Sequence, residues 1–157
     1  MRIAIDMDGT LMEFPEIYKA LIEAFEAAGH EVWIVTGRKG ETLVEDLALL
    51  ASMGVLKDAR HFINSMSFGE HERLLEEWSE KGQMSVDRDE IVCMWKARIL
   101  VGFDLVIDDA ADKIRLYMDG DKAEGVLLLK SPTMFNQVYA KWGRSHIMSY
   151  SEERKDA

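Results

Sequence analysis

Residues 3–10 have the sequence IAIDMDGT, in which a short apolar run ends at two aspartates and a Gly-Thr pair. The run is continuous rather than alternating, which is typical of a strand covered on both faces, as in a parallel sheet. In parallel α/β folds, ligands bind beyond the carboxyl ends of the strands. We therefore expect Asp6 and Asp8 to follow the first strand at the functional edge of a sheet.

The same pattern recurs along the rest of the chain. Further continuous apolar runs lie at residues 32–35, 105–107 and 126–129, and residues 60–64 are a weaker candidate for a strand. Helical periodicity of apolar side chains separates these runs at residues 15–28, 41–53, 88–101 and 110–119. Strands that alternate with helices over the whole length predict a three-layer α/β sandwich with a central, mostly parallel sheet.

The length of the chain predicts one catalytic domain. With 157 residues, it can bury a single core, which we assign to residues 1–145, followed by a polar tail at 146–157. Residues 66–87 interrupt the alternation and predict a short insertion, with a helix over 67–78 and a loop after it. The insertion is either a flap beside the site or an ordinary surface helix, and its polar composition favours the surface helix.

The composition argues against several classes of partner. The formal net charge of −10 opposes binding to nucleic acid, which proteins grip with Lys and Arg. Cys93 is the only cysteine, so no internal disulfide forms and nothing indicates an oxidising compartment. No apolar stretch approaches the ~20 residues needed to span a bilayer, and the N-terminus has no signal-peptide pattern. We expect a cytoplasmic protein that does not enter membranes.

Residues that could bind a ligand or take part in catalysis follow or precede the later strands. They are Thr36, Gly37 and Arg38 after the second strand, Lys96 in the helix before the fourth, and Asp108, Asp109 and Asp112 after it. Because the strands are expected to run parallel, these segments should meet Asp6 at one edge of the sheet.

This set of residues is suited to phosphoryl transfer. An aspartate such as Asp6 can attack phosphorus and form an aspartyl-phosphate, which splits one difficult step into two. A second carboxylate, Asp8, can protonate the leaving oxygen and then activate water. Mg²⁺ prefers oxygen ligands, and Asp6 and Asp108 end two strands that we expect to be neighbours. Lys96 would add a fixed positive charge, and Thr36 would offer its hydroxyl and nearby N–H groups to phosphate oxygens.

Other interpretations compete for several of these residues. Asp-Gly is a common turn pair, and a lysine such as Lys96 is more often a solvated helix residue. Arg38 is as well suited to a surface salt bridge as to substrate binding. Asp109 and Asp112 also suit the first turn of a helix, where the helix dipole favours carboxylates.

Taken together and in order, Asp-Met-Asp-Gly-Thr, Thr-Gly-Arg, a lone Lys and Asp-Asp-x-x-Asp resemble the four motifs of the haloacid dehalogenase-like (HAD) hydrolase superfamily. The resemblance covers roughly residues 1–130 and implies a Rossmann-like sheet. Only 25 residues separate Thr10 from Thr36, too few for a cap domain. The chain thus resembles the capless members, whose sites are open to large substrates or closed by a neighbouring subunit, as in a homo-oligomer.

The resemblance also implies a role for each residue. Asp6 would be the nucleophile, Asp8 the general acid/base, and Thr36 and Lys96 the groups that bind phosphate and stabilise charge, with Gly37 and Arg38 beside the substrate. Mg²⁺ would be held by Asp6, Asp108 and the main-chain carbonyl of Asp8. An aspartate at position 8 favours a phosphatase over a dehalogenase. Ile107 stands where the family usually has Gly, and the second acidic residue of the last motif is either Asp109 or Asp112.

The expected function is a Mg²⁺-dependent phosphatase acting on a small phosphorylated substrate. Local similarities around Trp95 and at residues 103–109 to capless phosphatases that act on nucleotides or polynucleotide ends place those compounds first, although the net charge disfavours a nucleic acid. One alternative is transfer of the phosphoryl group to an acceptor other than water, which needs a closed, dry site. Another is a catalytically idle domain of this fold that serves as a binding or interaction module.

Overall fold

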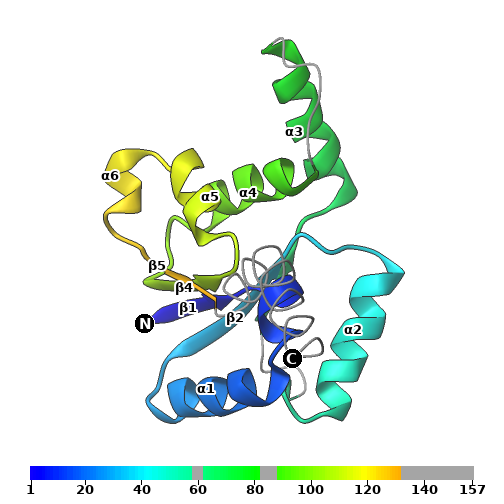
Figure 1. The fold of residues 1–157 in the computed structure, drawn as a ribbon, viewed down its shortest axis with the longest axis vertical. Coiled ribbons are helices and arrows are strands. Elements are labelled where there is room, and N and C mark those ends of the chain that lie inside the picture. Colours follow the sequence, from blue (N-terminus) through cyan, green and yellow to red (C-terminus); the bar gives the residue numbers. More distant parts are fainter. Residues whose placement is uncertain (58–61, 82–87, 132–157) are drawn as a thin grey trace, which may run out of the picture.

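The computed structural model describes residues 1–57, 62–81 and 88–131, and these form a sheet with helices on both faces (Figure 1). All five strands run parallel in the order β3-β2-β1-β4-β5. The strands are β1 (Arg2–Ile5), β2 (Glu31–Thr36), β3 (Phe62–Ser65), β4 (Leu105–Asp108) and β5 (Leu127–Lys130). The prediction of a Rossmann-like α/β fold is therefore confirmed.

Each apolar run of the sequence forms one of these strands, and the weaker candidate at 60–64 becomes β3. Residues 60 and 61 of that candidate lie outside the described residues, as do the predicted tail at 146–157 and the part of the predicted domain from 132 to 145.

Two layers of helices cover the sheet. One face carries α1 (Pro15–Ala27) and α2 (Glu41–Ser52), and the other carries α4 (Arg88–Ile99) and α5 (Ala111–Tyr117). The short helix α6 (Gly120–Ala123), which the sequence did not predict, leads into β5. The predicted helices match α1, α2, α4 and α5 to within a few residues at each end.

Alternate side chains of each central strand enter opposite layers, because the side-chain period of a strand is two. In β1, Ile3 and Ile5 pack with the α1 and α2 side, whereas Ala4 packs with the α4 and α5 side. In β4, Ile107 packs with the α1 and α2 side, and Val106 packs with the α4 and α5 side. Burial on both faces is the physical reason for continuous apolar runs rather than alternating ones.

The order in which strands are added to the sheet changes side at β1. The chain builds β1, β2 and β3 outward on one side, then crosses to place β4 on the other side of β1. Ile5 is in register with Ile107, and the main-chain N–H of Asp6 donates to the carbonyl oxygen of Ile107 at 3.0 Å. Asp6 and Asp108 therefore leave neighbouring strand ends side by side at the switch point, where α/β folds bind ligands.

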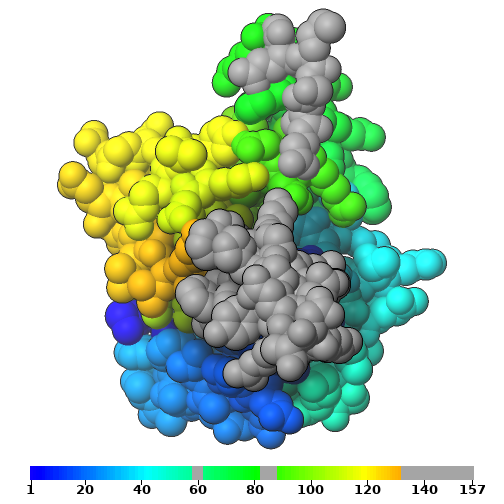
Figure 2. Space-filling view, in the orientation of Figure 1, coloured from blue at the N-terminus to red at the C-terminus, as the bar shows by residue number. Residues whose placement is uncertain are grey.

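The predicted insertion contains α3 (Phe68–Glu80), which confirms the helix expected over 67–78. Ser67 and Glu70 begin it with a capping box: the Ser67 hydroxyl accepts from the Glu70 N–H, and the Glu70 carboxylate accepts from the Ser67 N–H. Leu74 anchors α3 in the core on the α4 side, and the far end of α3 stands out from the molecule (Figure 2). Residues 82–87, the predicted loop, lie outside the described residues.

The described parts of the chain contain no helix with both the length and the apolar character to cross a membrane.

Candidate functional site

A wide, irregular turn carries the chain away from Asp6. It spans η1 (Met7–Leu11), where the main-chain N–H of Leu11 donates to the Asp6 carbonyl at 3.2 Å. Gly9 has a φ of +74°, which glycine adopts without strain. Turns of this π type occur often at functional sites, and this one places Asp6 and Asp8 just beyond the strand, where both keep extended backbone dihedrals.

Three carboxylates gather where β1 and β4 end. Oxygen atoms of Asp6, Asp108 and Asp109 all lie within 4.8 Å of one another. Asp6 is 5 % exposed and Asp108 1 %, whereas Asp109 is half-buried. Asp108 is also held in place by the main-chain N–H of Ala110, which donates to its Oδ1 at 2.8 Å. Buried carboxylates this close repel one another, and a nearby cation favours their ionised forms.

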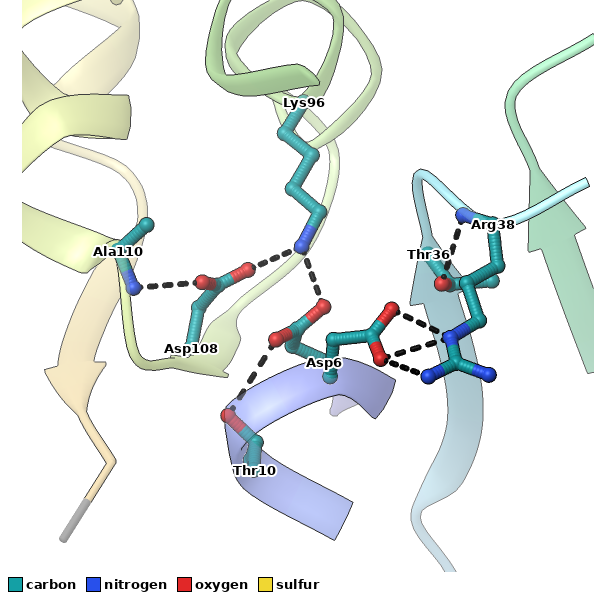
Figure 3. A network of polar contacts seen from close by, with 8 residues as sticks. Asp6, Thr10, Thr36, Arg38, Lys96, Asp108 and Ala110 are labelled. Carbon is teal, nitrogen blue, oxygen red and sulfur yellow. Dashed lines mark hydrogen bonds and ion pairs between the residues drawn. The ribbon is translucent and has the colours of Figure 1, made fainter. Parts of the chain in front are cut away.

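Lys96 supplies part of that positive charge (Figure 3). Its Nζ donates to Asp6 Oδ1 at 2.5 Å and to Asp108 Oδ2 at 2.6 Å, and the side chain is 5 % exposed. The hydroxyl of Thr10 donates to the other oxygen of Asp6 at 3.4 Å. α4 packs against the sheet, and Lys96 lies on the buried face of this helix. It therefore reaches the strand ends from inside the protein, whereas a lone lysine usually lies on the solvated face of a helix.

The pKa values reflect this crowding. Burial raises the pKa of Asp6 well above its ordinary value; the Lys96 charge opposes the rise and the Asp108 charge adds to it. Burial, followed by the Asp108 charge, also raises the pKa of Asp109. Burial tends to lower the pKa of Lys96, but the carboxylates of Asp108 and Asp6 outweigh it and raise the value. Lys96 therefore stays protonated throughout the physiological range.

The donor set fits a hard divalent cation. With all three carboxylates ionised, the one ammonium leaves an excess of two negative charges, which a divalent cation would balance. Carboxylate oxygens are the ligands that Mg²⁺, Ca²⁺ and Mn²⁺ prefer. Cys93 lies beside the same cleft, but burial raises the pKa of its thiol to about 12. It is thus not the thiolate that a softer metal would select.

Asp8 lies outside this cluster, against Arg38. Both Asp8 oxygens accept from Arg38 Nε at 2.7 Å, and Arg38 Nη2 lies 2.5 Å from Asp8 Oδ1. Arg38 also pairs with Asp46 of α2. The Asp8 side chain is half exposed, so it stands at the mouth of the site rather than inside it. A metal contact through its main-chain carbonyl stays a prediction.

Thr36 and Gly37 form the end of β2 beside the site. Thr36 is fully buried, and its hydroxyl oxygen accepts from the Arg38 N–H at 3.0 Å. This bond holds the turn between Thr36 and Arg38 (Figure 3), and the Arg38 side chain reaches Asp8 from that turn. A Cβ on Gly37 would come within 2.7 Å of both methyl carbons of Val92 in α4, so only glycine lets the turn and the helix approach this closely. Contact of Thr36 with a phosphate stays a prediction.

The two candidate carboxylates after Asp108 have different surroundings. Asp109 joins the cluster, and its Oδ2 would lie 2.5 Å from a Cβ on Gly9. Asp112 is in the first turn of α5, is 73 % exposed and binds Lys130 at 2.8 Å. Asp109 is therefore the residue that accompanies Asp108 at the strand end.

A cleft of about 620 Å³ opens over the cluster, a size typical of pockets for nucleotide-sized molecules. Most of the residues predicted from the sequence line it: Asp6, Asp8, Gly37, Arg38, Lys96 and Asp108. Thr42, Arg88 and Lys113 line it as well, and sequence reasoning did not single them out, because each stands alone on a helix with no motif around it.

We predict that Gly9→Ala destabilises the fold and loosens the cluster. The new Cβ would occupy a left-handed backbone conformation, at a cost of about 1–3 kcal/mol, and would collide with the Asp109 carboxylate. Urea unfolding would measure the loss. Gly69→Ala is a matched control, because a Cβ there has no neighbour within 4 Å; equal stability of the two variants would contradict the role assigned to Gly9.

No known protein-family model matches the chain, and no curated protein matches its sequence.

Proposed function

We propose that this protein is a Mg²⁺-dependent phosphatase of the HAD type, which hydrolyses a phosphomonoester through an aspartyl-phosphate on Asp6. One observation carries the proposal. A buried aspartate at a strand end shares a lysine with a second strand-end aspartate, at 2.5 and 2.6 Å, beneath an open cleft. A buried carboxylate held by one fixed cation and facing a cleft is suited to attack an electrophile.

In the first step, an oxygen of Asp6 forms a bond to phosphorus while the bond from phosphorus to the leaving oxygen breaks. Asp8, at the mouth of the cleft, gives its proton to that oxygen. In the second step, Asp8 takes a proton from water as the water attacks phosphorus, and the bond between phosphorus and Asp6 breaks. The products are inorganic phosphate, the alcohol and the original carboxylate.

Asp6, Asp108 and Asp109 are the residues that would hold Mg²⁺. When bound, the ion would offset the repulsion between the carboxylates and the phosphate dianion. Lys96 also offsets this repulsion, because its positive charge lies between Asp6 and Asp108.

Arg38 links substrate binding to proton transfer. In the structure its guanidinium is bound to the Asp8 carboxylate and to Asp46. A substrate phosphate competes for the same guanidinium, because arginine binds phosphate and carboxylate with the same fork of N–H groups. Engagement of phosphate by Arg38 then releases Asp8 to act on the leaving oxygen.

A phosphate-release screen tests the proposal. We expect the purified protein to hydrolyse phosphomonoesters, among them nucleotides, sugar phosphates and 3′- or 5′-phosphorylated oligonucleotides, only when Mg²⁺ is present. EDTA should remove the activity and excess Mg²⁺ should restore it. Asp119→Asn, which changes an exposed carboxylate that pairs with Lys122 and does not line the cleft, is the control and should keep activity.

The alternatives give different results in the same screen. A binding module would bind Mg²⁺ in calorimetry without turning over any compound. A phosphotransferase would release more of the alcohol than of inorganic phosphate when an acceptor alcohol is added. Activity that persists in EDTA would contradict a metal-dependent site.

A further inference from the structure

A second group of basic side chains lies near the acidic cleft, and the proposed chemistry does not use it. We call Lys39, His71 and Arg88 the basic rim. Lys39 follows Arg38 in the segment between β2 and α2, His71 lies in the first turns of α3, and Arg88 begins α4. Three segments far apart in sequence supply these side chains, and the charge of Arg88 acts on both Lys39 and His71.

The contacts within the basic rim are close. Lys39 Nζ lies 2.8 Å from His71 Nδ1, and it also lies 5.6 Å from the centroid of the Phe68 ring. An ammonium over an aromatic face is held by the ring's negative charge. Phe68 is 64 % exposed and Lys39 is half-buried, so this contact lies at the surface of the protein.

Among the described residues, carboxylates neutralise the charge of Arg38, but they do not neutralise the charges of Lys39 and Arg88 in the basic rim. Arg38 pairs with Asp8 and Asp46. Within the described ranges, by contrast, Lys39 and Arg88 form no ion pair with a carboxylate. Since net charge is strongly negative overall, unpaired cations gathered at one place indicate a site for an anion.

The pKa values agree with repulsion among these groups. Burial, followed by the charge of Arg88, lowers the pKa of Lys39. Burial, followed by the charges of Lys39 and Arg88, lowers the pKa of His71, and Glu72 opposes this only in part. A bound anion would relieve the repulsion and favour the protonated forms.

The basic rim adjoins the cleft through Arg88. Arg88 lines the cleft together with Arg38 and the residues of the acidic cluster, and Lys39 is adjacent to Arg38 in the chain. A phosphate group over Asp6 occupies only part of about 620 Å³. The rest of a longer substrate would extend past Arg38 towards Arg88 and Lys39.

We propose that Lys39, His71 and Arg88 bind a second phosphate group of the substrate, so that the preferred substrates are small molecules with phosphates at two positions. This proposal rests on the proposed phosphatase function, because it takes Asp6 as the point where the reacting phosphate lies. The Lys39 ammonium and the Arg88 guanidinium neutralise the second phosphate, and His71 donates a further hydrogen bond. Phe68 positions Lys39.

Paired substrates test the proposal. We would compare kcat/KM for a nucleoside 3′,5′-bisphosphate with that for its 3′- and 5′-monophosphates, and for fructose 1,6-bisphosphate with fructose 6-phosphate. Hydrogen bonds to charged groups are stronger than neutral ones, so we expect the bisphosphate of at least one pair to be favoured by about tenfold or more. Two reactive groups alone would give about twofold by statistics. Equal efficiency within both pairs would overturn the proposal.

Substitutions in the basic rim test whether the preference for the bisphosphate arises there. We expect Lys39→Met to lower the bisphosphate-to-monophosphate ratio about tenfold, whereas Lys122→Met in α6 should leave the ratio unchanged. Arg88→Gln should lower the ratio as well and provides an independent test if Lys39→Met does not fold. A ratio that survives both substitutions would show that the second phosphate binds elsewhere.

Calorimetry on an Asp6→Asn background separates this proposal from the proposed function. Tighter binding of the bisphosphate than of the monophosphate, lost with Lys39→Met, would support the basic rim even if the wild-type protein released no phosphate. Phosphate release with equal binding and equal efficiency for both compounds would support the phosphatase function and refute the basic rim as a phosphate site.

Discussion

Asp6→Asn is expected to lower phosphate release by about 10⁴-fold or more, a loss typical of removing the nucleophile of an enzyme with a covalent intermediate. The amide keeps the shape of the carboxylate but cannot attack phosphorus. It also removes one of the three acidic side chains of the cluster. Steady-state assays with a colour reagent for phosphate would measure the loss.

Two further measurements make this result specific. Asp119→Asn removes a carboxylate that is exposed, bound to Lys122 and outside the cleft, so it should leave the rate within a few-fold of wild type. Circular dichroism should show that Asp6→Asn is folded, because its N–H bond to Ile107 involves only the main chain. Retention of most of the wild-type activity in Asp6→Asn would exclude Asp6 as the nucleophile.

Lys96→Met is expected to have the largest effect on stability, a loss of about 3–5 kcal/mol at neutral pH, as for the removal of one partner from a buried ion pair. Methionine fills much of the same volume but leaves the carboxylates of Asp6 and Asp108 buried without their common cation. Urea unfolding would measure the free energy. Lys122→Met, which breaks only an exposed pair with Asp119, should be within about 0.5 kcal/mol of wild type.

The pH dependence of Lys96→Met has a defined sign. The pKa of folded Asp6 lies above its ordinary value, chiefly through burial, and in the wild-type protein Lys96 opposes that rise. Without Lys96 the folded-state pKa is expected to rise further, so the folded state binds more protons than the unfolded state between the two values. Stability should therefore increase as pH falls through that window and be lost as pH rises above it.

Mg²⁺ should also stabilise Lys96→Met more than wild type, because ligand binding to the folded state adds to its stability and the variant's cluster has a larger uncompensated charge. Thermal unfolding with and without Mg²⁺ would measure this difference. An equal shift in both proteins would indicate that Mg²⁺ binds away from Asp6, Asp108 and Asp109.

The order of the elements could be predicted from the sequence because the signals are local. Each run that forms a strand, such as residues 3–5 and 105–107, is apolar on successive positions, as burial on both faces requires. The helix over 67–78 was predictable from its own composition and begins with a capping box made by residues three apart. α6 has four residues and is too short to produce a periodic signal.

The proximity of Asp6, Lys96 and Asp108 could be predicted as well, although they are distant in sequence. Parallel strands bring their carboxyl ends to one edge of the sheet. β1 and β4 are adjacent because the chain, after adding β2 and β3 on one side of β1, adds β4 on the other side. The choice between Asp109 and Asp112 could not be made in advance. It depends on where α5 begins, and on the close approach of Asp109 to Gly9.

By itself, the sequence determined a parallel α/β sandwich and the segments that supply its polar edge, because hydrophobic periodicity and strand-end position are properties of short stretches. The tertiary structure alone decided which side chains meet there. Arg38 pairs with Asp8 and Asp46, Asp109 joins the cluster, and Lys39 contacts His71 of a distant segment. Such contacts depend on the packing of α2, α3 and α4 against the sheet, which no local pattern encodes.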